Sequence, residues 1–346
     1  MGKITLTING TAVTADEGTT ILVAALAKGI YIPHLCHQKD LEPVGVCRLC
    51  MVEVKGWRKP VISCKTSVEE GLEVITESEE INKIRKVGVE LLIASHDSDC
   101  LACGKSTNCT LQRVAQHVGV DIQNLGRIRD RQEKLPIDSS NPFFSFDPNR
   151  CVLCGICVRT CDELQGLNAI DYVYRGVGTK IAGFYDRSRL ESNCESCGEC
   201  VVRCPVGALI PKDTQPPTHK VKTVCTYCGC GCGIIFGVRD NKLVQANGDI
   251  NNPASRGRLC VKGRYGYRFV NSPERLTKPL IKKNGELVEA EWDEALDLIA
   301  EKFSNSKGDQ FATIASAKCT NEENYLTQKF TRAVMGTNTI DHCARL

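Results

Sequence analysis

The chain has 346 residues, of which 42% are hydrophobic and 25% charged, and it carries 22 cysteines. This length predicts two or more domains, and the N-terminus has no charged leader ahead of an apolar run that would indicate a secretory signal. No stretch approaches about 18 uninterrupted apolar residues, so we expect no membrane span and, with cysteines favouring metal over disulfides, a cytoplasmic protein.

The formal net charge of +3 does not account for bound metal. An oxidised iron–sulfur cluster with four thiolates carries about −2, and one with a histidine ligand about −1. Filling every cysteine group described below would bring the protein to roughly −6. We therefore expect no nucleic-acid partner.

Residues 1–78 have the pattern of a small β-grasp domain. Residues 4–8 alternate apolar and polar side chains, and Asn9-Gly10 favours a hairpin turn. A helix is expected over residues 21–28, capped by Thr20 or Thr19. Strand, turn, strand, helix and a cysteine loop in this order resemble plant-type [2Fe–2S] ferredoxins.

That loop supplies the first group of four cysteines, in a pattern that plant ferredoxins use with a shorter first gap. A structural zinc could use the same thiolates, but the preceding β-grasp pattern favours [2Fe–2S]. His34 and His37 flank the first cysteine; since four cysteines suffice, we expect them to be surface residues. The ligands are Cys36, Cys47, Cys50 and Cys64.

Residues 79–119 hold a group with one histidine. Apolar residues near helical spacing over 81–92 lead to His96, and a second short helix is expected over 111–118. A zinc knuckle is one interpretation. The arrangement resembles the histidine-ligated [4Fe–4S] segment of the complex I large iron–sulfur subunit and of iron hydrogenases, which also follows a β-grasp domain. That resemblance implies the ligands His96, Cys100, Cys103 and Cys109.

After a predicted linker over residues 120–145, residues 138–213 contain an internal repeat of the form C-x2-C-G-x-C-V-x2-C. This is the two-cluster bacterial ferredoxin pattern, in which the fourth cysteine of each run ligates the other cluster. One [4Fe–4S] cluster is expected on Cys151, Cys154, Cys157 and Cys204. The second is expected on Cys194, Cys197, Cys200 and Cys161.

Residues 218–274 carry the fifth group, Cys225, Cys228, Cys232 and Cys260. It resembles the [4Fe–4S] module of molybdopterin oxidoreductases that bind two pyranopterin guanosine dinucleotides, and this resemblance puts Lys262 between cluster and pterin. A basic run follows the same segment. It forms either a solvated surface or a counter-charge for cluster and pterin phosphates: Arg256, Arg258, Lys262, Arg264 and Arg268.

Residues 275–346 differ from the preceding segments in their pattern of apolar residues. Apolar residues over 292–303 predict one helix face and residues 311–315 a short buried strand, as in the opening of a larger α/β domain. Three cysteines, Cys230, Cys319 and Cys343, are left outside the groups and are expected to be spectators. No dinucleotide or P-loop motif is present, so nicotinamide or flavin would bind a partner.

The segments 317–325 and 341–346 resemble the catalytic subunit of cytoplasmic, metal-dependent formate dehydrogenases. In that family the next residue after Leu346 would be the selenocysteine or cysteine bound to molybdenum or tungsten. We hypothesise an in-frame UGA codon after codon 346; a UAA or UAG in the gene would refute this. A short electron-transfer protein or a cloned fragment is the alternative.

The expected fold class is an α+β multidomain iron–sulfur protein: β-grasp ferredoxin, histidine–cysteine segment, two-cluster ferredoxin, molybdopterin-oxidoreductase module, and the start of an α/β domain at 275–346. The resemblance implies one [2Fe–2S] and four [4Fe–4S] clusters, with a molybdenum or tungsten bis(pyranopterin guanosine dinucleotide) in the full-length enzyme. Electrons from formate would pass near Lys262 through the clusters to an NAD(H) flavoprotein subunit, a ferredoxin or a hydrogenase module, in a hetero-oligomer. The rivals are a non-catalytic relay subunit, a complex I- or hydrogenase-type subunit, and a zinc-stabilised binding module.

Overall fold

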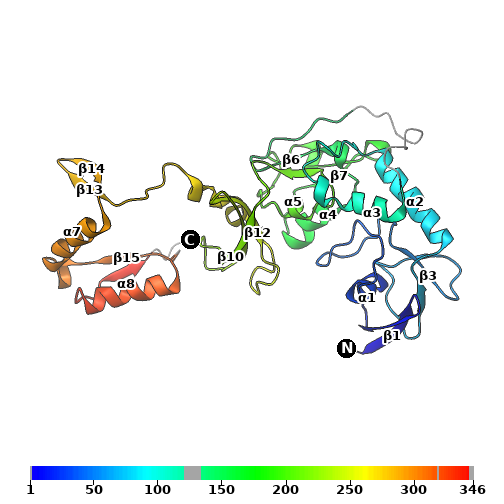
Figure 1. The fold of residues 1–346 in the computed structure, drawn as a ribbon, viewed down its shortest axis with the longest axis horizontal. Helices are drawn as coiled ribbons and strands as arrows, with labels where there is room; N and C mark the ends of the chain where they lie inside the picture. Colours follow the sequence, from blue (N-terminus) through cyan, green and yellow to red (C-terminus); the bar gives the residue numbers. More distant parts are fainter. Residues whose placement is uncertain (1, 121–133, 318, 343–346) are drawn as a thin grey trace. The chain divides into compact units, whose positions relative to one another are not determined.

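The structure, a computed structural model, describes residues 2–120, 134–317 and 319–342 (Figure 1). The chain divides into two units, residues 1–213 and 214–346. Cys343 and the position after Leu346 lie outside the described residues, so the expectations about them stay predictions. No helix in the described part is long and apolar enough to cross a bilayer.

The first unit begins with the expected β-grasp. Its first hairpin turns at Asn9 and Gly10, both with positive φ (52° and 78°), which is the backbone that a two-residue hairpin turn needs. The Thr20 hydroxyl accepts the Val23 N–H at 3.4 Å and so caps the predicted helix. The elements are β1 (Lys3–Ile8), β2 (Thr11–Asp16), α1 (Ile21–Ala27), β3 (Met51–Val54), β4 (Val61–Ile62) and β5 (Glu73–Ile75).

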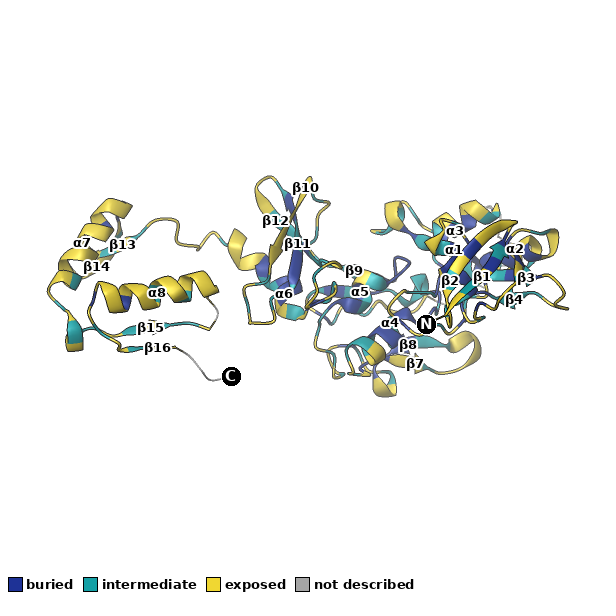
Figure 2. Cartoon of the chain, turned by 90° about the horizontal axis from the view of Figure 1, so that it is seen from below, coloured by how far each residue is buried: buried dark blue, intermediate teal, exposed yellow. Residues whose placement is uncertain are grey.

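The strands form one sheet in the order β2-β1-β5-β3-β4, with β1 and β5 parallel and the other neighbours antiparallel. The inner strands and α1 share a hydrophobic core, seen as the buried part of the domain in Figure 2. Cys50 and Cys64 belong to this core. The first cysteine group is therefore positioned by the packing of the β-grasp itself.

Two helices follow, α2 (Glu79–Ala94) and α3 (Thr110–Val118), close to the predicted ranges. Ser78 caps α2 by accepting the Ile81 N–H at 3.2 Å. Arg85 on α2 is 1% exposed. It donates from Nε to the Leu49 carbonyl at 3.2 Å and from Nη2 to the Met51 carbonyl at 2.8 Å. Arg85 thus joins α2 to the chain around Cys50.

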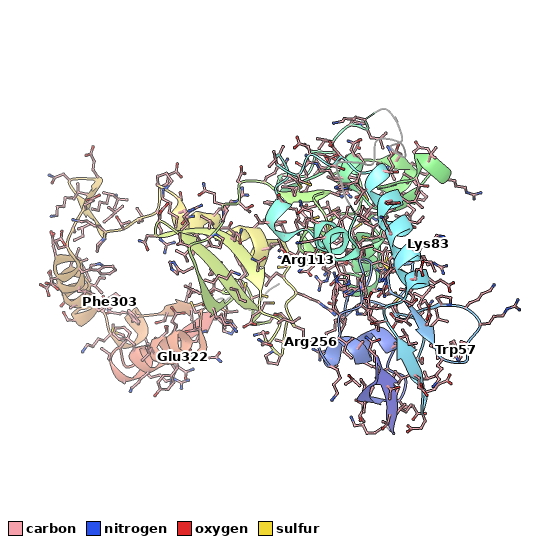
Figure 3. The ribbon with its side chains drawn as sticks, turned by 45° about the vertical axis from the view of Figure 1, so that its right-hand side comes forward. Trp57, Lys83, Arg113, Arg256, Phe303 and Glu322 are labelled. Carbon is pink, nitrogen blue, oxygen red and sulfur yellow. The ribbon has the colours of Figure 1, made fainter. Side chains whose placement is uncertain are left out.

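We expect Arg85→Met to lower the stability of this unit by about 2–4 kcal/mol, because the buried Leu49 carbonyl and the partly buried Met51 carbonyl lose their donor. Lys83→Met is the matched control, since Lys83 lies exposed on the same helix (Figure 3). The midpoint of thermal unfolding, followed by circular dichroism, measures the effect. Equal midpoints for the two variants would contradict the role given to Arg85.

The two-cluster ferredoxin segment is closed by β6 (Phe144–Phe146) pairing with β9 (Leu209–Pro211). Part of the predicted linker is structured, since Asp138 pairs with Phe146 through both backbone N–H groups at 2.9 Å; residues 121–133 lie outside the described residues. The remaining elements are α4 (Ile156–Arg159), a π-helical turn (Thr160–Leu164), β7 (Asp171–Val173), β8 (Lys180–Ala182) and α5 (Glu199–Arg203).

The second unit starts with an antiparallel sheet in the order β10-β11-β12, packed against α6. Its core contains Ile234, Ala246, Leu259 and Tyr267, with Cys225 and Cys232 against it. The last part alternates strands and helices, with β15 and β16 parallel. The elements are β10 (His219–Val224), β11 (Gly233–Arg239), β12 (Lys242–Gly248), α6 (Val261–Tyr265), β13 (Leu280–Lys283), β14 (Glu286–Glu289), α7 (Trp292–Ser304), β15 (Thr313–Ala315), α8 (Asn321–Ala333) and β16 (Ile340–His342).

One expectation about this region is wrong. The strand predicted over 311–315 is present as β15, but Ile314 is 85% exposed instead of buried. Trp292 and Leu296 on the apolar face of α7 are also exposed, and Figure 2 shows α7 and α8 mostly in the exposed colour. The physical reason is that two helices and a two-stranded sheet offer too little surface, among the described residues, to cover these side chains.

Candidate metal centres

The first four cysteines come together as two pairs. A hydrogen bond from Cys47 lowers the pKa of Cys36 to about 6, and one from Cys64 lowers the pKa of Cys50 to about 7. The two pairs are close enough for Cys36 to raise the pKa of Cys64, after the larger effects of its hydrogen bond to Cys50 and of burial. Two pairs of thiols match a two-iron cluster, which takes two protein ligands on each iron.

The two histidines that flank Cys36 were predicted to lie at the surface, and the structure instead places them partly in the interior. His34 and His37 are half-buried, with their rings edge-on at 5.7 Å. His34 Nδ1 lies 2.7 Å from the Ile32 carbonyl. Burial lowers the pKa of His37. The prediction of two exposed histidines was wrong because the loop around Cys36 packs against the rest of the domain and covers them in part.

This loop is anchored to the ferredoxin segment by Arg159 of α4. Its Nη2 donates to the Cys36 carbonyl at 2.7 Å and its Nη1 to the Glu42 carbonyl at 2.6 Å. A second contact runs from Arg203 of α5 to Asp40 at 2.7 Å. The first cysteine group and the helices of the two-cluster segment are thus held side by side within the first unit.

The second group forms a cavity at the end of α2. His96, Cys100, Cys103 and Cys109 all line it, together with Gly207 of the ferredoxin segment. His96 is 9% exposed, and burial lowers the pKa of its ring, which favours the neutral form that binds metal. The structure therefore gathers the four predicted ligands in one place.

The ferredoxin repeat is visible in the backbone. Leu153 and Ser196 stand two residues after the first cysteine of each run, with φ of 50° and 56°. Each donates its N–H to that cysteine's Sγ at 3.4 Å. N–H···S bonds of this kind stabilise charge on a cluster and tune its potential.

The motif predicts that the two runs exchange their last cysteine, and the surroundings of the cysteines are consistent with it: Cys204 lies near Cys151 and Cys154, and Cys161 near Cys194 and Cys200. Burial raises the pKa of Cys157, and the charges of Cys151, Cys154, Cys200 and Cys204 raise it further, so Cys157 lies near cysteines of both runs. Burial likewise raises the pKa of Cys200 to about 12, with further contributions from Cys197, Cys194 and Cys161. Cys161 lies in the π-helical turn and lines one cavity with Cys194, Cys197 and Cys200.

The fifth group lies on the loop between β10 and β11 and at the start of α6. The Cys225 N–H donates to the Cys232 carbonyl at 2.8 Å, and burial raises the pKa of Cys225, with Cys260 and Cys228 adding to the effect. Cys230, one of the predicted spectators, is exposed and has its Sγ 3.5 Å from that of Cys232.

The basic run around this group splits in two. Arg264 is buried, with 4% exposure, and Arg258 is half-buried. Arg256, Lys262 and Arg268 are exposed, and Figure 3 labels Arg256 on this segment. The run therefore has a buried part and an exposed part, and the counter-charge interpretation stays a prediction.

Several buried polar atoms next to these groups have no hydrogen-bond partner among the described residues. Each buried donor of this kind costs about 1–3 kcal/mol unless something absent from the protein atoms accepts from it. His96 lines the cavity of the histidine group, and Thr160 and Arg189 line the cavity of Cys161, Cys194, Cys197 and Cys200. In these two cavities the sulfides and thiolates of a bound cluster would be acceptors. The atoms are His37 Nδ1, His96 Nδ1, Arg159 Nε, Thr160 Oγ1, Arg189 Nε and Nη2, and Arg258 Nε.

No group of three or more histidine, cysteine, aspartate or glutamate side chains in the described part is arranged to hold a single metal ion. Three of the predicted groups are nevertheless gathered: the first as two pairs of thiols, and the histidine group and the Cys161–Cys194–Cys197–Cys200 group around one cavity each. None of the described cysteines is in a disulfide.

A cleft in the second unit joins the two segments that resemble formate dehydrogenases. It lies at the carboxyl ends of the parallel strands β15 and β16, where ligands bind in open α/β sheets. Asn324 helps shape it by donating to the Ser316 carbonyl at 3.2 Å. Its lining includes Ser316, Ala317, Asn324, Gln328, Asp341 and His342.

Comparison with known families gives an ordered series of matches. Residues 2–79 match "2Fe-2S iron-sulfur cluster binding domain", 85–124 "NADH-ubiquinone oxidoreductase-G iron-sulfur binding region" and 150–208 "4Fe-4S dicluster domain". Residues 218–272 match "Molybdopterin oxidoreductase Fe4S4 domain" and 275–346 "Molybdopterin oxidoreductase". Two of the five matching models are molybdopterin oxidoreductase models, and the other three are iron–sulfur domain models. These matches confirm the expected fold class, a series of iron–sulfur domains followed by the start of a molybdopterin domain.

Its relatives have different names. The chain is 38% identical to the NADPH-Fe(3+) oxidoreductase alpha subunit of Geobacter sulfurreducens and 33% identical to an NADH-quinone oxidoreductase component of Rhizobium meliloti. A Staphylococcus haemolyticus protein whose name provisionally assigns formate dehydrogenase is 30% identical. The matches cover 98–99% of this chain but only 39–40% of the relatives, so the chain spans about two fifths of their length.

Among solved structures, the NAD+-reducing [NiFe]-hydrogenase in its H2-reduced state contains a similar chain. The TM-score is 0.56 at 33% sequence identity, over 60% of this chain and 87% of that one. Sequence reasoning did not find the cleft in the second unit or the unpartnered arginine donors, because no spacing in the chain indicates either. Cavity lining and burial were the signals that revealed them.

Proposed function

We propose that the chain is the electron-relay part of a molybdenum- or tungsten-dependent formate dehydrogenase. The observation that carries this proposal is the cleft at β15 and β16, where the two segments that resemble formate dehydrogenases meet in the same unit as the Cys225 group. The name of the Staphylococcus haemolyticus relative points the same way. The metal-binding selenocysteine or cysteine is expected after Leu346.

Five clusters are proposed, one [2Fe–2S] on the first group and four [4Fe–4S] on the others. The segments that hold them are residues 1–78, 79–119, 138–213 (two clusters) and 218–274, with the pterin domain starting at 275. The proposed ligands are Cys36, Cys47, Cys50 and Cys64; His96, Cys100, Cys103 and Cys109; Cys151, Cys154, Cys157 and Cys204; Cys194, Cys197, Cys200 and Cys161; and Cys225, Cys228, Cys232 and Cys260.

The residues present fit the pterin as well as the clusters. A metal bis(pyranopterin guanosine dinucleotide), when bound, would exchange two electrons with the substrate. Lys262 is exposed two residues after Cys260 and can meet such a ligand beside the cluster. Asn324 and His342 line the cleft and offer polar groups to orient it.

Both N-terminal groups adjoin the same ferredoxin group in the first unit. Cys36 lies close enough to Cys154 to contribute to its raised pKa, behind burial and nearer cysteines. On the other side, the Thr110 N–H donates to the Pro205 carbonyl at 2.9 Å, directly after Cys204. Two branches would therefore meet at the cluster held by Cys204, which gives an electron partner two points of access.

The acceptor is proposed to be a separate subunit, an NAD(H) flavoprotein, a ferredoxin or a hydrogenase module, in a cytoplasmic hetero-oligomer. A second candidate function, an NADH-quinone oxidoreductase- or hydrogenase-type relay, is favoured by the Rhizobium meliloti relative and by the hydrogenase chain of similar fold. Both candidates need the same relay in the first unit, and they differ in the electron donor.

The test has two parts. The chain, prepared without oxygen, is expected to hold about eighteen irons and eighteen labile sulfides, and zinc in their place would exclude the relay. The complete protein with its partner subunits is then mixed with formate, NADH or hydrogen, and cluster reduction is followed by visible absorbance and electron paramagnetic resonance (EPR). Reduction by formate supports the first candidate, and reduction by NADH or hydrogen alone supports the second.

A further inference from the structure

Arg189 is one of the most buried charged residues of the first unit. It precedes Cys194 in the segment that joins the two ferredoxin runs, and it is 2% exposed. Its guanidinium carbon lies 4.0 Å from the centre of the Phe146 ring, and its Nη1 lies 3.4 Å from Asp138 Oδ2. The Arg189 backbone N–H donates to the same carboxylate at 3.2 Å. The side chain is therefore held in one place.

Two of its donors are left over. Nε and Nη2 are buried and have no hydrogen-bond partner among the described residues. Arg189 also lines the cavity formed by Cys161, Cys194, Cys197 and Cys200. Burying an arginine with two unused N–H groups is costly, so an acceptor is expected inside that cavity.

The charge of Arg189 reaches both ferredoxin groups. It is the one cation among the described residues that line this cavity; of the two carboxylates there, Glu195 is exposed and Glu199 pairs with Arg203. Arg189 is close enough for its positive charge to act on Cys200 of the second run and on Cys151 of the first. Its own partner Asp138 keeps a side-chain exposure of 20%, so water weakens the neutralisation.

We infer that Arg189 sets the reduction potential of the ferredoxin cluster pair, by donating N–H···S hydrogen bonds to the cluster on Cys161, Cys194, Cys197 and Cys200. A one-electron reduction adds a negative charge to the cluster, and a fixed cation with two donors stabilises the reduced form. The inference rests on the proposed cluster ligation. Arg189 is a positioning and tuning residue and is not a ligand.

The test is an EPR-monitored redox titration of the full chain and of its Arg189→Gln, Arg189→Lys and Asp138→Asn variants. At a fixed potential, Arg189→Gln is expected to lower the ratio of reduced to oxidised cluster about tenfold, a 59 mV shift for a one-electron couple. Arg189→Lys keeps the charge but not the planar donors, so it should lower the same ratio by a smaller factor. Asp138→Asn should shift the ratio the opposite way, because it removes a negative charge.

Arg187→Gln is the matched control, since Arg187 is an exposed cation in the same loop. If all variants keep their clusters and have the same reduction potential as the unchanged protein, the inference is overturned. If Arg189→Gln fails to assemble, the opposite shifts expected for Arg189→Lys and Asp138→Asn still decide the question. Absence of any cubane signal in the unchanged chain would instead refute the proposed function.

Discussion

Replacing Cys204 by serine is expected to remove the cluster of the first ferredoxin run and to spare that of its own run. Cys204 is 8% exposed, and its charge acts on Cys151, Cys154 and Cys157. Losing this ligand should lower iron and labile sulfide by about four each. If both N-terminal branches meet at this cluster, as proposed, the loss of the cluster should abolish electron transfer between the N-terminal clusters and the rest of the relay. Iron analysis and EPR measure the first effect, and stopped-flow reduction measures the second.

Double variants test which cysteines bind the same cluster. Cys204→Ser with Cys151→Ser should lose no more iron than either alone, because both changes affect one cluster. Cys204→Ser with Cys194→Ser should lose about eight irons, because two clusters are affected. Cys319→Ser, an exposed cysteine outside the groups, is the control. If Cys204 and Cys194 behaved as ligands of one cluster, the exchange of the fourth cysteine would be wrong.

Local signals account for much of what could be predicted. The Asn9-Gly10 turn, the Thr20 cap and the two helices around the second cysteine group each depend on a few neighbouring residues, and the structure has them where the sequence indicated. The predicted cluster ligands rest on the same kind of local signal, the spacing of the cysteines. A cluster needs thiolates on a tight loop, and a loop is a local feature of the chain.

Features that depend on distant parts of the chain were missed. Ile314 lies on a strand with an apolar sequence, yet its burial depends on which elements pack over it. For His37 and Arg189 the error runs the other way. Their polarity alone predicts exposure, but His37 is half-buried and Arg189 is buried. The cleft at β15 and β16 required two segments to meet in space, which no spacing along the chain reports.

Gly207→Ala is expected to remove the cluster of the histidine group, although Gly207 lies in the two-cluster ferredoxin segment and not in residues 79–119. A Cβ at this position would clash with the Cys103 Sγ, whereas its next neighbours, on Arg150 and Lys105, would be at 3.7 Å. Cys103 would have to move, and Cys103 is a proposed cluster ligand. The expected result is a loss of about four irons and four sulfides, with the [2Fe–2S] signal retained.

Gly104→Ala is the matched control, because it adds the same methyl group one residue away from Cys103. There the new Cβ would meet only Ile210 side-chain atoms, the nearest at 3.5 Å, which is ordinary contact. Neither glycine has a positive φ, so backbone strain affects neither comparison. Both variants should fold, and only Gly207→Ala should lose the signal of the histidine-ligated cluster. Equal iron content in the two would mean that the ferredoxin segment does not close the site of His96, and that the second branch of the relay ends elsewhere.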